Sequence, residues 1–272
     1  MKNPYKVEKA KIIKKEKQND ITYLFRLKLP ANLQKKFEFL PGQFMQVGLM
    51  GFREAPISIS SGPKDAKRFI ELTIRGVGRI TNKLIDLKVG DEILVRGPFG
   101  NGFPEPKDKN LILIGGGCGF VPLRSVIETY KTDKNIKLQV FIGCKDKNTL
   151  FFKNQFAAWK KLSDFNLILE KGTLLGLFGK SGFVTELLDK PLLENALVLV
   201  VGPPIMYKAV VKKLLQKGIK PEDIYLSLEK RMYCGQGVCQ HCAIGTKYIC
   251  KDGPVFSYKE LSELSPTFRL WS

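Results

Sequence analysis

The sequence predicts two domains of different architecture followed by a small C-terminal module: an antiparallel β-barrel, then an α/β domain with a doubly wound parallel sheet. Residues 5–103 hold short apolar runs, several of them alternating, between Gly, Pro and Asp, which is typical of a barrel or sandwich. Residues 110–230 alternate apolar strands with helical patterns, which favours parallel βαβ units. From about 230 the periodicity ends, and four of the six cysteines lie in 233–250.

The barrel half contains five strand-like runs: 6–13, 20–29, 42–49, 69–75 and 91–97. Two other stretches, REAPISISSGP (53–63) and ELTIRGVGRITNKL (71–84), combine small hydroxyl residues, glycines and arginine. Such residues can bind a flat heterocycle and its phosphates, although a plain strand–turn–strand has the same composition. A Pro-, Gly- and charge-rich linker is expected at 101–109.

The second half contains five strand patterns, at 110–116, 137–143, 165–170, 196–202 and 223–229. The four helical patterns between them are 123–132, 152–162, 183–190 and 204–218. Strands that alternate with helices of this length predict crossover connections and one parallel sheet.

A glycine-rich turn ends the strand at 110–116. GGGCG at 115–119 places four glycines in five positions, and Pro122 follows in the expected first helical turn. Glycine lets the backbone approach a phosphate, and the free N–H groups of a helix start favour an anion. Phe120 replaces the last glycine of the G-x-G-x-x-G motif. The turn indicates a nucleotide-phosphate site, with a tight turn without ligand as the alternative.

The strand at 196–202 ends in Gly202, Pro203 and Pro204, and we expect a helix to start near Ile205. Open α/β sheets bind ligands at the carboxyl edge of their strands. This turn is therefore expected to form a second wall of the same crevice, although a simple helix-entry turn would have the same residues.

The cysteine spacing is C-x4-C-x2-C-x7-C, with Gly235 and Gly237 inside the first loop. C-x4-C-x2-C with a fourth cysteine is the plant-type arrangement for a [2Fe–2S] cluster. Structural zinc sites more often use two short pairs, and only one pair here is short. Zinc and two disulfides stay open as alternatives. His241 is interpreted as a bystander, and Cys118 and Cys144 as packing residues.

Composition excludes several classes of protein. No apolar run approaches the length of a membrane helix, and the charged start MKNPYKVEKAKIIKK is unlike a signal peptide. We therefore expect a cytoplasmic protein, in which disulfides are rare. The net charge of +19 is interpreted as a lysine-rich surface that could help dock a partner. A zinc-stabilised nucleic-acid-binding protein is the rival of a different class.

Together these segments resemble the ferredoxin–NADP reductase superfamily over nearly the whole chain. They are most similar to its FAD/[2Fe–2S] electron-transfer subunits: sulfhydrogenase (hydrogenase/sulfur reductase) gamma, anaerobic sulfite reductase B and dihydroorotate dehydrogenase types. APISISS resembles the flavin-binding R-x-[YF]-S segment, GVGRITNKL the FAD pyrophosphate loop, and VRGPFGNGF the strand that closes the barrel. GGGCGFVPLRS resembles the nicotinamide dinucleotide phosphate loop, and VGPPIM the nicotinamide border.

The resemblance implies an FAD-binding barrel (1–104), an NAD(P)-binding α/β domain (105–228) and a [2Fe–2S] module (229–272). The implied FAD-binding residues are Arg53, Pro56, Ile57, Ser58, Ile59, Ile74, Arg75, Gly78 and Thr81. The implied NAD(P)-binding residues are Gly115, Gly116, Gly117, Cys118, Gly119, Pro122, Gly202, Pro203, Pro204 and Met206. The implied cluster ligands are Cys234, Cys239, Cys242 and Cys250.

Three motif positions depart from the family. Ala55 stands where the flavin motif has arginine, with Arg53 and Arg75 as available substitutes, and Ile57 stands where it has an aromatic ring. Val201 replaces a cysteine of the C-G-P segment. The choice between NADH and NADPH stays open, because Glu170 could repel a 2′-phosphate while Lys145, Lys147 and Lys171 could attract one.

The implied function is that of an NAD(P)H-dependent oxidoreductase subunit, which exchanges electrons with an iron–sulfur, hydrogenase or reductase partner subunit, or with ferredoxin. A nicotinamide exchanges two electrons and a cluster one at a time, so the flavin, which can do both, must lie between them. This chemistry needs no catalytic acid or base from the protein. A dihydroorotate dehydrogenase electron-transfer subunit is the alternative assignment.

Overall fold

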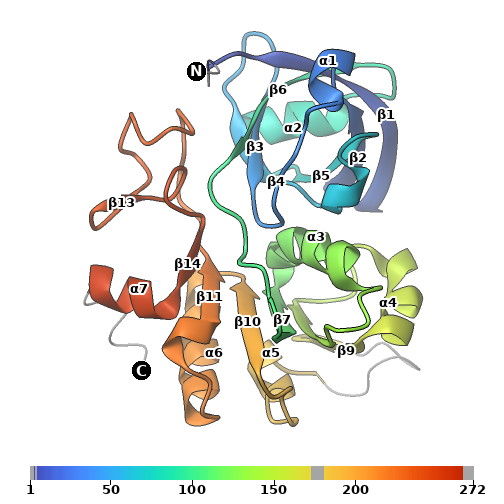
Figure 1. The fold of residues 1–272 in the computed structure, drawn as a ribbon. Coiled ribbons are helices and arrows are strands. Elements are labelled where there is room, and N and C mark those ends of the chain that lie inside the picture. Colours follow the sequence, from blue (N-terminus) through green and yellow to red (C-terminus); the bar gives the residue numbers. More distant parts are fainter. Residues whose placement is uncertain (1–2, 4, 173–180, 266–272) are drawn as a thin grey trace.

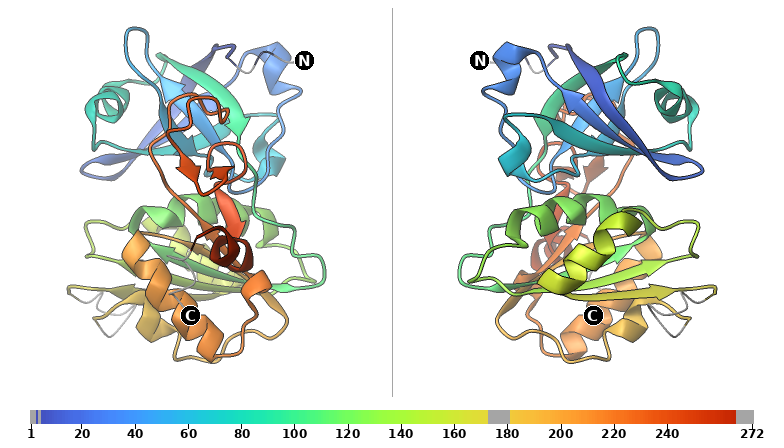
Figure 2. Two further views of the ribbon diagram at one scale, coloured as in Figure 1. Left: turned by 90° about the vertical axis from the view of Figure 1, so that its left-hand side faces the viewer. Right: turned by 90° about the vertical axis from the view of Figure 1, so that its right-hand side faces the viewer.

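The computed structural model describes residues 3, 5–172 and 181–265, and it contains the barrel, the α/β domain and the module that the sequence predicts (Figure 1). The barrel lies above the α/β domain in Figure 1. The left view of Figure 2 shows the C-terminal module in front of the junction between the two domains. Within the described ranges, no helix has the length and apolar character needed to cross a membrane.

The first domain is an antiparallel barrel with the strand order β4-β3-β6-β1-β2-β5. An antiparallel bridge between Ile59 and Leu72 joins its two edge strands, so the sheet closes on itself. The strands are β1 (Glu8–Asn19), β2 (Thr22–Lys28), β3 (Phe44–Gly48), β4 (Ala55–Ser58), β5 (Ile70–Arg75) and β6 (Glu92–Phe99). The helices are α1 (Ala31–Gln34), η1 (Pro63–Asp65) and α2 (Arg79–Asp86).

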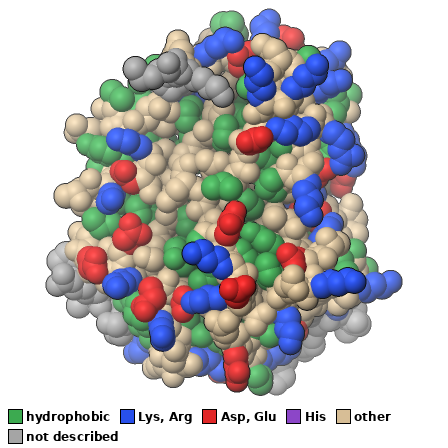
Figure 3. Space-filling view, in the orientation of Figure 1, with side chains coloured by type: hydrophobic (Ala, Val, Ile, Leu, Met, Phe, Trp, Pro, Cys, Tyr) green, Lys and Arg blue, Asp and Glu red, His purple; other side chains and the backbone are tan. Residues whose placement is uncertain are grey.

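The barrel core follows from the alternation in the sequence. In β1, Ala10 and Ile12 are buried while Lys9 and Lys11 are exposed, because successive side chains of a strand point to opposite faces. The outer face therefore carries lysines. Figure 3 shows Lys and Arg side chains spread over both domains, with many of them over the barrel.

The second domain is a sheet with the order β14-β11-β10-β7-β8-β9, parallel except for β14. Its strands are β7 (Asn110–Gly116), β8 (Leu138–Cys144), β9 (Asp164–Leu169), β10 (Ala196–Val201), β11 (Ile224–Ser227) and β14 (Val255–Ser257). Its helices are η2 (Gly117–Gly119), α3 (Phe120–Tyr130), η3 (Lys153–Gln155), α4 (Phe156–Leu162), α5 (Val184–Leu187), α6 (Pro204–Gln216) and η4 (Pro221–Asp223).

Two buried clusters, one on each face of this sheet, hold the helices. Leu111 and Leu113 of β7 belong to the cluster that includes α3 and α4. Ile112 and Ile114 belong to the cluster that includes α5 and α6. A strand buried on both faces has a continuous apolar sequence, as β7 does, and this is typical of parallel sheets.

The C-terminal module has more regular structure than the sequence pattern predicts, since that pattern ends at about 230. It contains the hairpin β12 (Ala243–Ile244) and β13 (Lys247–Tyr248), the edge strand β14, and helix α7 (Tyr258–Leu264). Glu260 N donates to Ser257 Oγ at 3.1 Å in a capping box that begins α7. This S-x-x-E signal was available in the sequence.

The linker after β6 holds the module in place. Asn101 Nδ2 donates to the carbonyl oxygens of Asp252 (2.9 Å) and Val255 (2.8 Å), and Val255 N donates to Asn101 Oδ1 at 3.1 Å. Helix α3 is bound to the barrel in a similar way, because Ser125 Oγ donates to the Ser61 carbonyl at 2.7 Å. The three parts are thus connected by polar contacts around one junction.

Candidate functional site

A cavity of about 390 Å³ opens where the barrel, the α/β domain and the module meet. Pro56 and Ser58 of β4 line one side. Pro122 of α3 and Val201 of β10 line another, and Met232 before the cysteine loop closes a third. The cavity is therefore lined by residues of both the flavin-like and the nucleotide-like motifs, which lie far apart in the sequence.

The turns after β7 and β10 are in direct contact. A Cβ atom on Gly202 would lie 3.3 Å from Gly116 Cα and 2.8 Å from Met206 Sδ. A Cβ atom on Gly119 would lie 2.1 Å from the carbonyl oxygen of Val201. The sequence prediction places these turns at one crevice, and in the structure their glycines let the two backbones touch.

Tyr207 holds the turn after β10 against the next strand. Gly202 N donates to the Tyr207 hydroxyl at 3.2 Å, and that hydroxyl donates to the Ser227 carbonyl. A phenol is protonated at neutral pH in any case, and burial raises the pKa of Tyr207 further, so its hydrogen-bond donor is kept. Helix α6 begins at Pro204, as the helical pattern 204–218 predicts, where the missing N–H of proline is not needed.

Because the two turns touch, alanine substitutions at Gly119 and at Gly116 should lower stability by different amounts. Gly119→Ala places a methyl group against the backbone of Val201, and we expect it to lower the free energy of unfolding by about 3 kcal/mol. In the matched variant Gly116→Ala, the nearest atom is the end of the Met206 side chain, which can move, so we expect a loss of about 1 kcal/mol. Urea unfolding of both variants checks this, and equal losses would contradict the close backbone contact.

Five of the expected flavin-binding residues, which lie on or beside β4 and β5, fall into two groups. Pro56 and Ser58 line the cavity. Ile59 and Ile74 are fully buried, and Ile57 packs against the same barrel core. The side chains of Ile59 and Ile74 therefore support the barrel core and do not face the cavity.

The start of α2 is a tightly bonded loop. Val77 N and Gly78 N donate to Thr81 Oγ1 at 3.1 and 2.9 Å, and Thr81 Oγ1 donates to the Gly78 carbonyl at 3.2 Å. The hydroxyl of Thr81 thus shapes the loop. Arg79, which the motif comparison did not single out, begins the helix with its guanidinium 5.6 Å from the Phe52 ring.

The two arginines considered as substitutes for the motif arginine lie in different places. Arg75 Nη1 donates to Cys118 Sγ at 3.3 Å, which places it beside the 115–119 turn. Arg53 lies near the cysteine module, with its guanidinium 5.9 Å from the Tyr233 ring. Arg75 is therefore the one next to the nucleotide turn. Cys144 is buried, and burial raises the pKa of its thiol to about 12, in keeping with a packing residue.

The cysteine loop directs backbone N–H groups at cysteine sulfurs. Gln236 N and Cys239 N lie 3.3 and 3.4 Å from Cys234 Sγ, and Gly237 N lies 3.1 Å from Cys250 Sγ. Gly235 and Gly237 have φ angles of 73° and 74°, which glycine adopts without strain. Four thiols with this donor set fit an iron–sulfur cluster, because such N–H groups stabilise its negative charge.

Two further observations concern this loop. His241 Nδ1 lies 3.1 Å from the Cys239 carbonyl, and its ring lies edge-on to Tyr233 at 4.4 Å. None of the six cysteines forms a disulfide bond. In the ranges that the structure describes, no three His, Cys, Asp or Glu side chains are grouped so as to hold a single metal ion.

The cavity also contains a residue that the motifs did not indicate. Glu229 lines it two residues after the end of β11, and loss of hydration raises the pKa of its carboxyl. Its position at the carboxyl end of a parallel strand is the signal that could have identified it, since open α/β sheets bind ligands there.

Three families match successive parts of the chain. Residues 9–103 match the oxidoreductase FAD-binding domain, and residues 113–212 the oxidoreductase NAD-binding domain. Residues 229–262 match the iron–sulfur cluster binding domain of dihydroorotate dehydrogenase B. The chain therefore has FAD-, NAD- and iron–sulfur-binding domains, which removes the support for a zinc-stabilised nucleic-acid-binding protein.

Similar proteins cover nearly the same length. The sulfhydrogenase 2 subunit gamma of Pyrococcus furiosus is 41% identical over 280 residues, which cover 94% of this chain and 96% of that protein. A probable dihydroorotate dehydrogenase B (NAD(+)) electron transfer subunit of Methanocaldococcus jannaschii is 34% identical over 228 residues, 82% of this chain and 81% of that one. A solved chain of an NADH-dependent reduced ferredoxin–NADP oxidoreductase superposes with a TM-score of 0.75 at 26% identity, covering 96% of this chain and 94% of its own.

Proposed function

The chain belongs to the family of the sulfhydrogenase gamma and dihydroorotate dehydrogenase B electron-transfer subunits, and from this premise we propose how it works. It transfers electrons between NAD(P)H and a partner subunit through bound FAD and a [2Fe–2S] cluster. The observation that carries the proposal is the cavity shared by Ser58, Val201 and Met232, because it joins the flavin segment, the nucleotide turns and the start of the cysteine module.

Each part of the chain has a defined task in this proposal. Ser58 and Pro56 position the flavin ring, and the start of α2 faces its phosphates. Arg75 lies between that loop and the nucleotide turn, where its Nη1 donates to Cys118 Sγ. The turn at 115–119 binds the NAD(P) pyrophosphate, and the turn at 202–206 places the nicotinamide. The four cysteines ligate the cluster. When bound, the flavin exchanges two electrons with the nicotinamide and single electrons with the cluster.

We assign residues 1–104 to the FAD domain, 105–228 to the NAD(P) domain and 229–272 to the cluster module. The separate sheets of the first two domains support the first boundary. We propose that the partner is an iron–sulfur subunit of a hydrogenase or sulfur reductase complex and that the complex lies in the cytoplasm. The sulfhydrogenase name of the 41% identical relative supports a hydrogenase complex. A dihydroorotate dehydrogenase complex is the second candidate, on the basis of the relatives at 34% identity.

Absorption spectra of anaerobically purified protein test the proposal. We expect flavin bands with a broad iron–sulfur shoulder, and bleaching of both by NADH or by NADPH, which would also identify the coenzyme. A colourless protein after iron-replete anaerobic expression would overturn the proposal. Flavin bands without the iron–sulfur shoulder would support the reductase assignment and contradict the cluster assignment. The subunits that co-purify with the native protein distinguish between the two candidate complexes.

A further inference from the structure

Gln46 is a fully buried polar residue on the barrel. It lies in the middle of β3 and is 0% exposed, yet neither Nε2 nor Oε1 of its side chain has a hydrogen-bond partner within the residues that the structure describes. Buried side-chain amides are nearly always bonded, because leaving them unpaired costs the full loss of their hydration. A partner for this amide is therefore expected from something bound at the site.

The surroundings of Gln46 indicate what is bound there. A Cβ atom on Gly235 would lie 3.4 Å from Gln46 Cγ, so the side chain packs against the residue that follows Cys234. On the neighbouring strand β6, Arg96 pairs in register with Gln46. Arg96 Nη1 and Nη2 each donate to the Cys234 carbonyl at 3.3 Å. Two adjacent barrel strands thus present polar groups to the cysteine loop.

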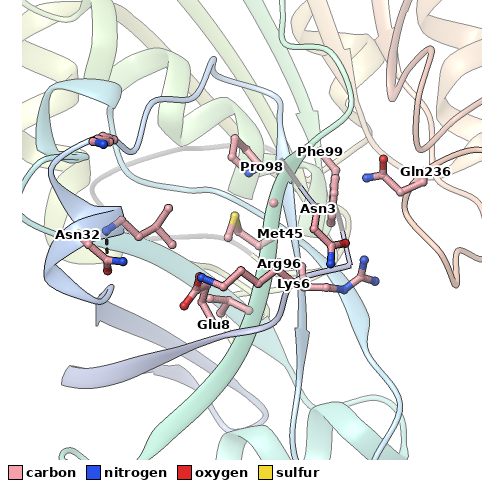
Figure 4. A pocket seen from close by; sticks show the side chains of 13 residues that line it. Asn3, Lys6, Glu8, Asn32, Met45, Arg96, Pro98, Phe99 and Gln236 are labelled. Carbon is pink, nitrogen blue, oxygen red and sulfur yellow. Dashed lines mark hydrogen bonds and ion pairs between the residues drawn. The ribbon is translucent and has the colours of Figure 1, made fainter. Parts of the chain in front are cut away.

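Arg96 is held in one position by its contacts. Arg96 is 6% exposed, and its Nε donates to Glu54 Oε1 at 2.8 Å. It borders a second cavity, of about 560 Å³, together with Phe99 and Gln236. Figure 4 shows Gln236 of the cysteine loop across from Phe99 at the edge of this cavity. The loop is therefore seated on the barrel at this point, and Arg96 acts on it through Cys234.

We propose that the Gln46 amide donates a hydrogen bond to a sulfur of the iron–sulfur site and thereby raises the reduction potential of the cluster. This inference rests on the proposed function. Reduction adds negative charge to the cluster, so a donor to its sulfurs stabilises the reduced form more than the oxidised form. Backbone donors from 236, 237 and 239 already reach the cysteine sulfurs, and Gln46 adds a donor from the barrel. Since Gln46 lies on β3, this hydrogen bond connects the proposed FAD domain directly to the cluster site.

The experiment compares Gln46→Met with wild type in the full holoprotein. Methionine keeps the length of the side chain and removes both polar atoms. We expect the ratio of reduced to oxidised cluster at a fixed ambient potential to fall threefold to tenfold, about 59 mV for tenfold in a one-electron couple. The midpoint is followed by the electron paramagnetic resonance signal of the reduced cluster, and iron per chain is measured in parallel. Gln46→Leu also removes both polar atoms with an apolar side chain, and should lower the midpoint to a similar extent.

Thr22→Val is the matched control. Thr22 is also buried, and its side-chain oxygen has no hydrogen-bond partner in the described part of the chain. It lies on β2, which two strands separate from β3. We expect its cluster midpoint to equal that of wild type. Wild-type protein without iron or a resonance signal would overturn the proposed function itself. A wild-type cluster whose midpoint is unchanged in both Gln46 variants would overturn this inference alone, and would mean that Gln46 has only a packing role.

Discussion

Replacing Cys239 with alanine should remove the cluster and leave flavin chemistry intact. Cys239 is partly exposed in a loop outside the barrel and the parallel sheet, so losing its side chain leaves no cavity in either core. Loss of one of four thiolate ligands should lower iron retention by about 100-fold or more, since even indirect supports of metal sites are worth 10–100-fold. We expect iron per chain near zero, while NAD(P)H still reduces a two-electron dye that takes electrons directly from flavin.

Val238→Ala is the control for this variant. Val238 is adjacent, 67% exposed and not a proposed ligand, so its variant should keep both iron and dye reduction. A Cys239→Ala protein with full iron content would contradict the proposed ligand set. If His241→Ala lost iron in the same experiment, the fourth ligand would be the histidine.

The sequence predicts those features that residues close together in the chain determine. Alternating burial in β1 and the doubly buried run of β7 arise from the local geometry of a strand. The cysteine spacing is likewise contained in one loop. For this reason the two sheets and the iron–sulfur domain could be predicted from the sequence.

The contacts between the parts could not be predicted in this way. Periodicity shows that a face is buried but not which element covers it. Nothing local distinguishes Gln46 from a core residue of an ordinary strand, yet its side chain lies against Gly235, almost two hundred positions away. Of the two candidate arginines, only the structure separates Arg75 at the nucleotide turn from Arg53 at the module.

Arg124 also makes contacts between the domains that could not be predicted from the sequence. In sequence it lies two positions after Pro122 and has the appearance of a solvated helix residue. In the structure its side chain is buried between the domains, where Nη1 donates to Glu71 Oε2 at 2.8 Å and to the Ser60 carbonyl at 2.7 Å. Its Nε donates to Gln155 Oε1 at 3.0 Å. It therefore fixes α3 of the nucleotide domain to the barrel.

Arg124→Met should lower the free energy of unfolding by about 3–5 kcal/mol, because it leaves the buried Glu71 short of a partner. Among the residues that the structure describes, the Glu71 carboxylate would retain Arg26 as its charged partner, and Arg26 is itself partly exposed. The matched control is Arg68→Met, which breaks an ion pair with Asp65 whose arginine side chain is 72% exposed. Exposed pairs contribute about 1 kcal/mol or less. Urea unfolding of both variants measures the difference, and similar small losses would show that the interdomain pair contributes little.

The same variant tests whether the two domains must be held together for electron transfer. Helix α3 carries Pro122 into the cavity that Ser58 lines from the barrel, so loosening α3 changes the distance between the proposed nicotinamide and flavin positions. Misplacement of reacting groups by about 1 Å can cost up to 100-fold in rate. We expect flavin reduction by saturating NAD(P)H to slow by about tenfold or more in Arg124→Met, with flavin content unchanged, as measured by stopped-flow absorbance. A stable variant with a wild-type rate would mean that the bound cofactors themselves, rather than Arg124, hold the two domains in register.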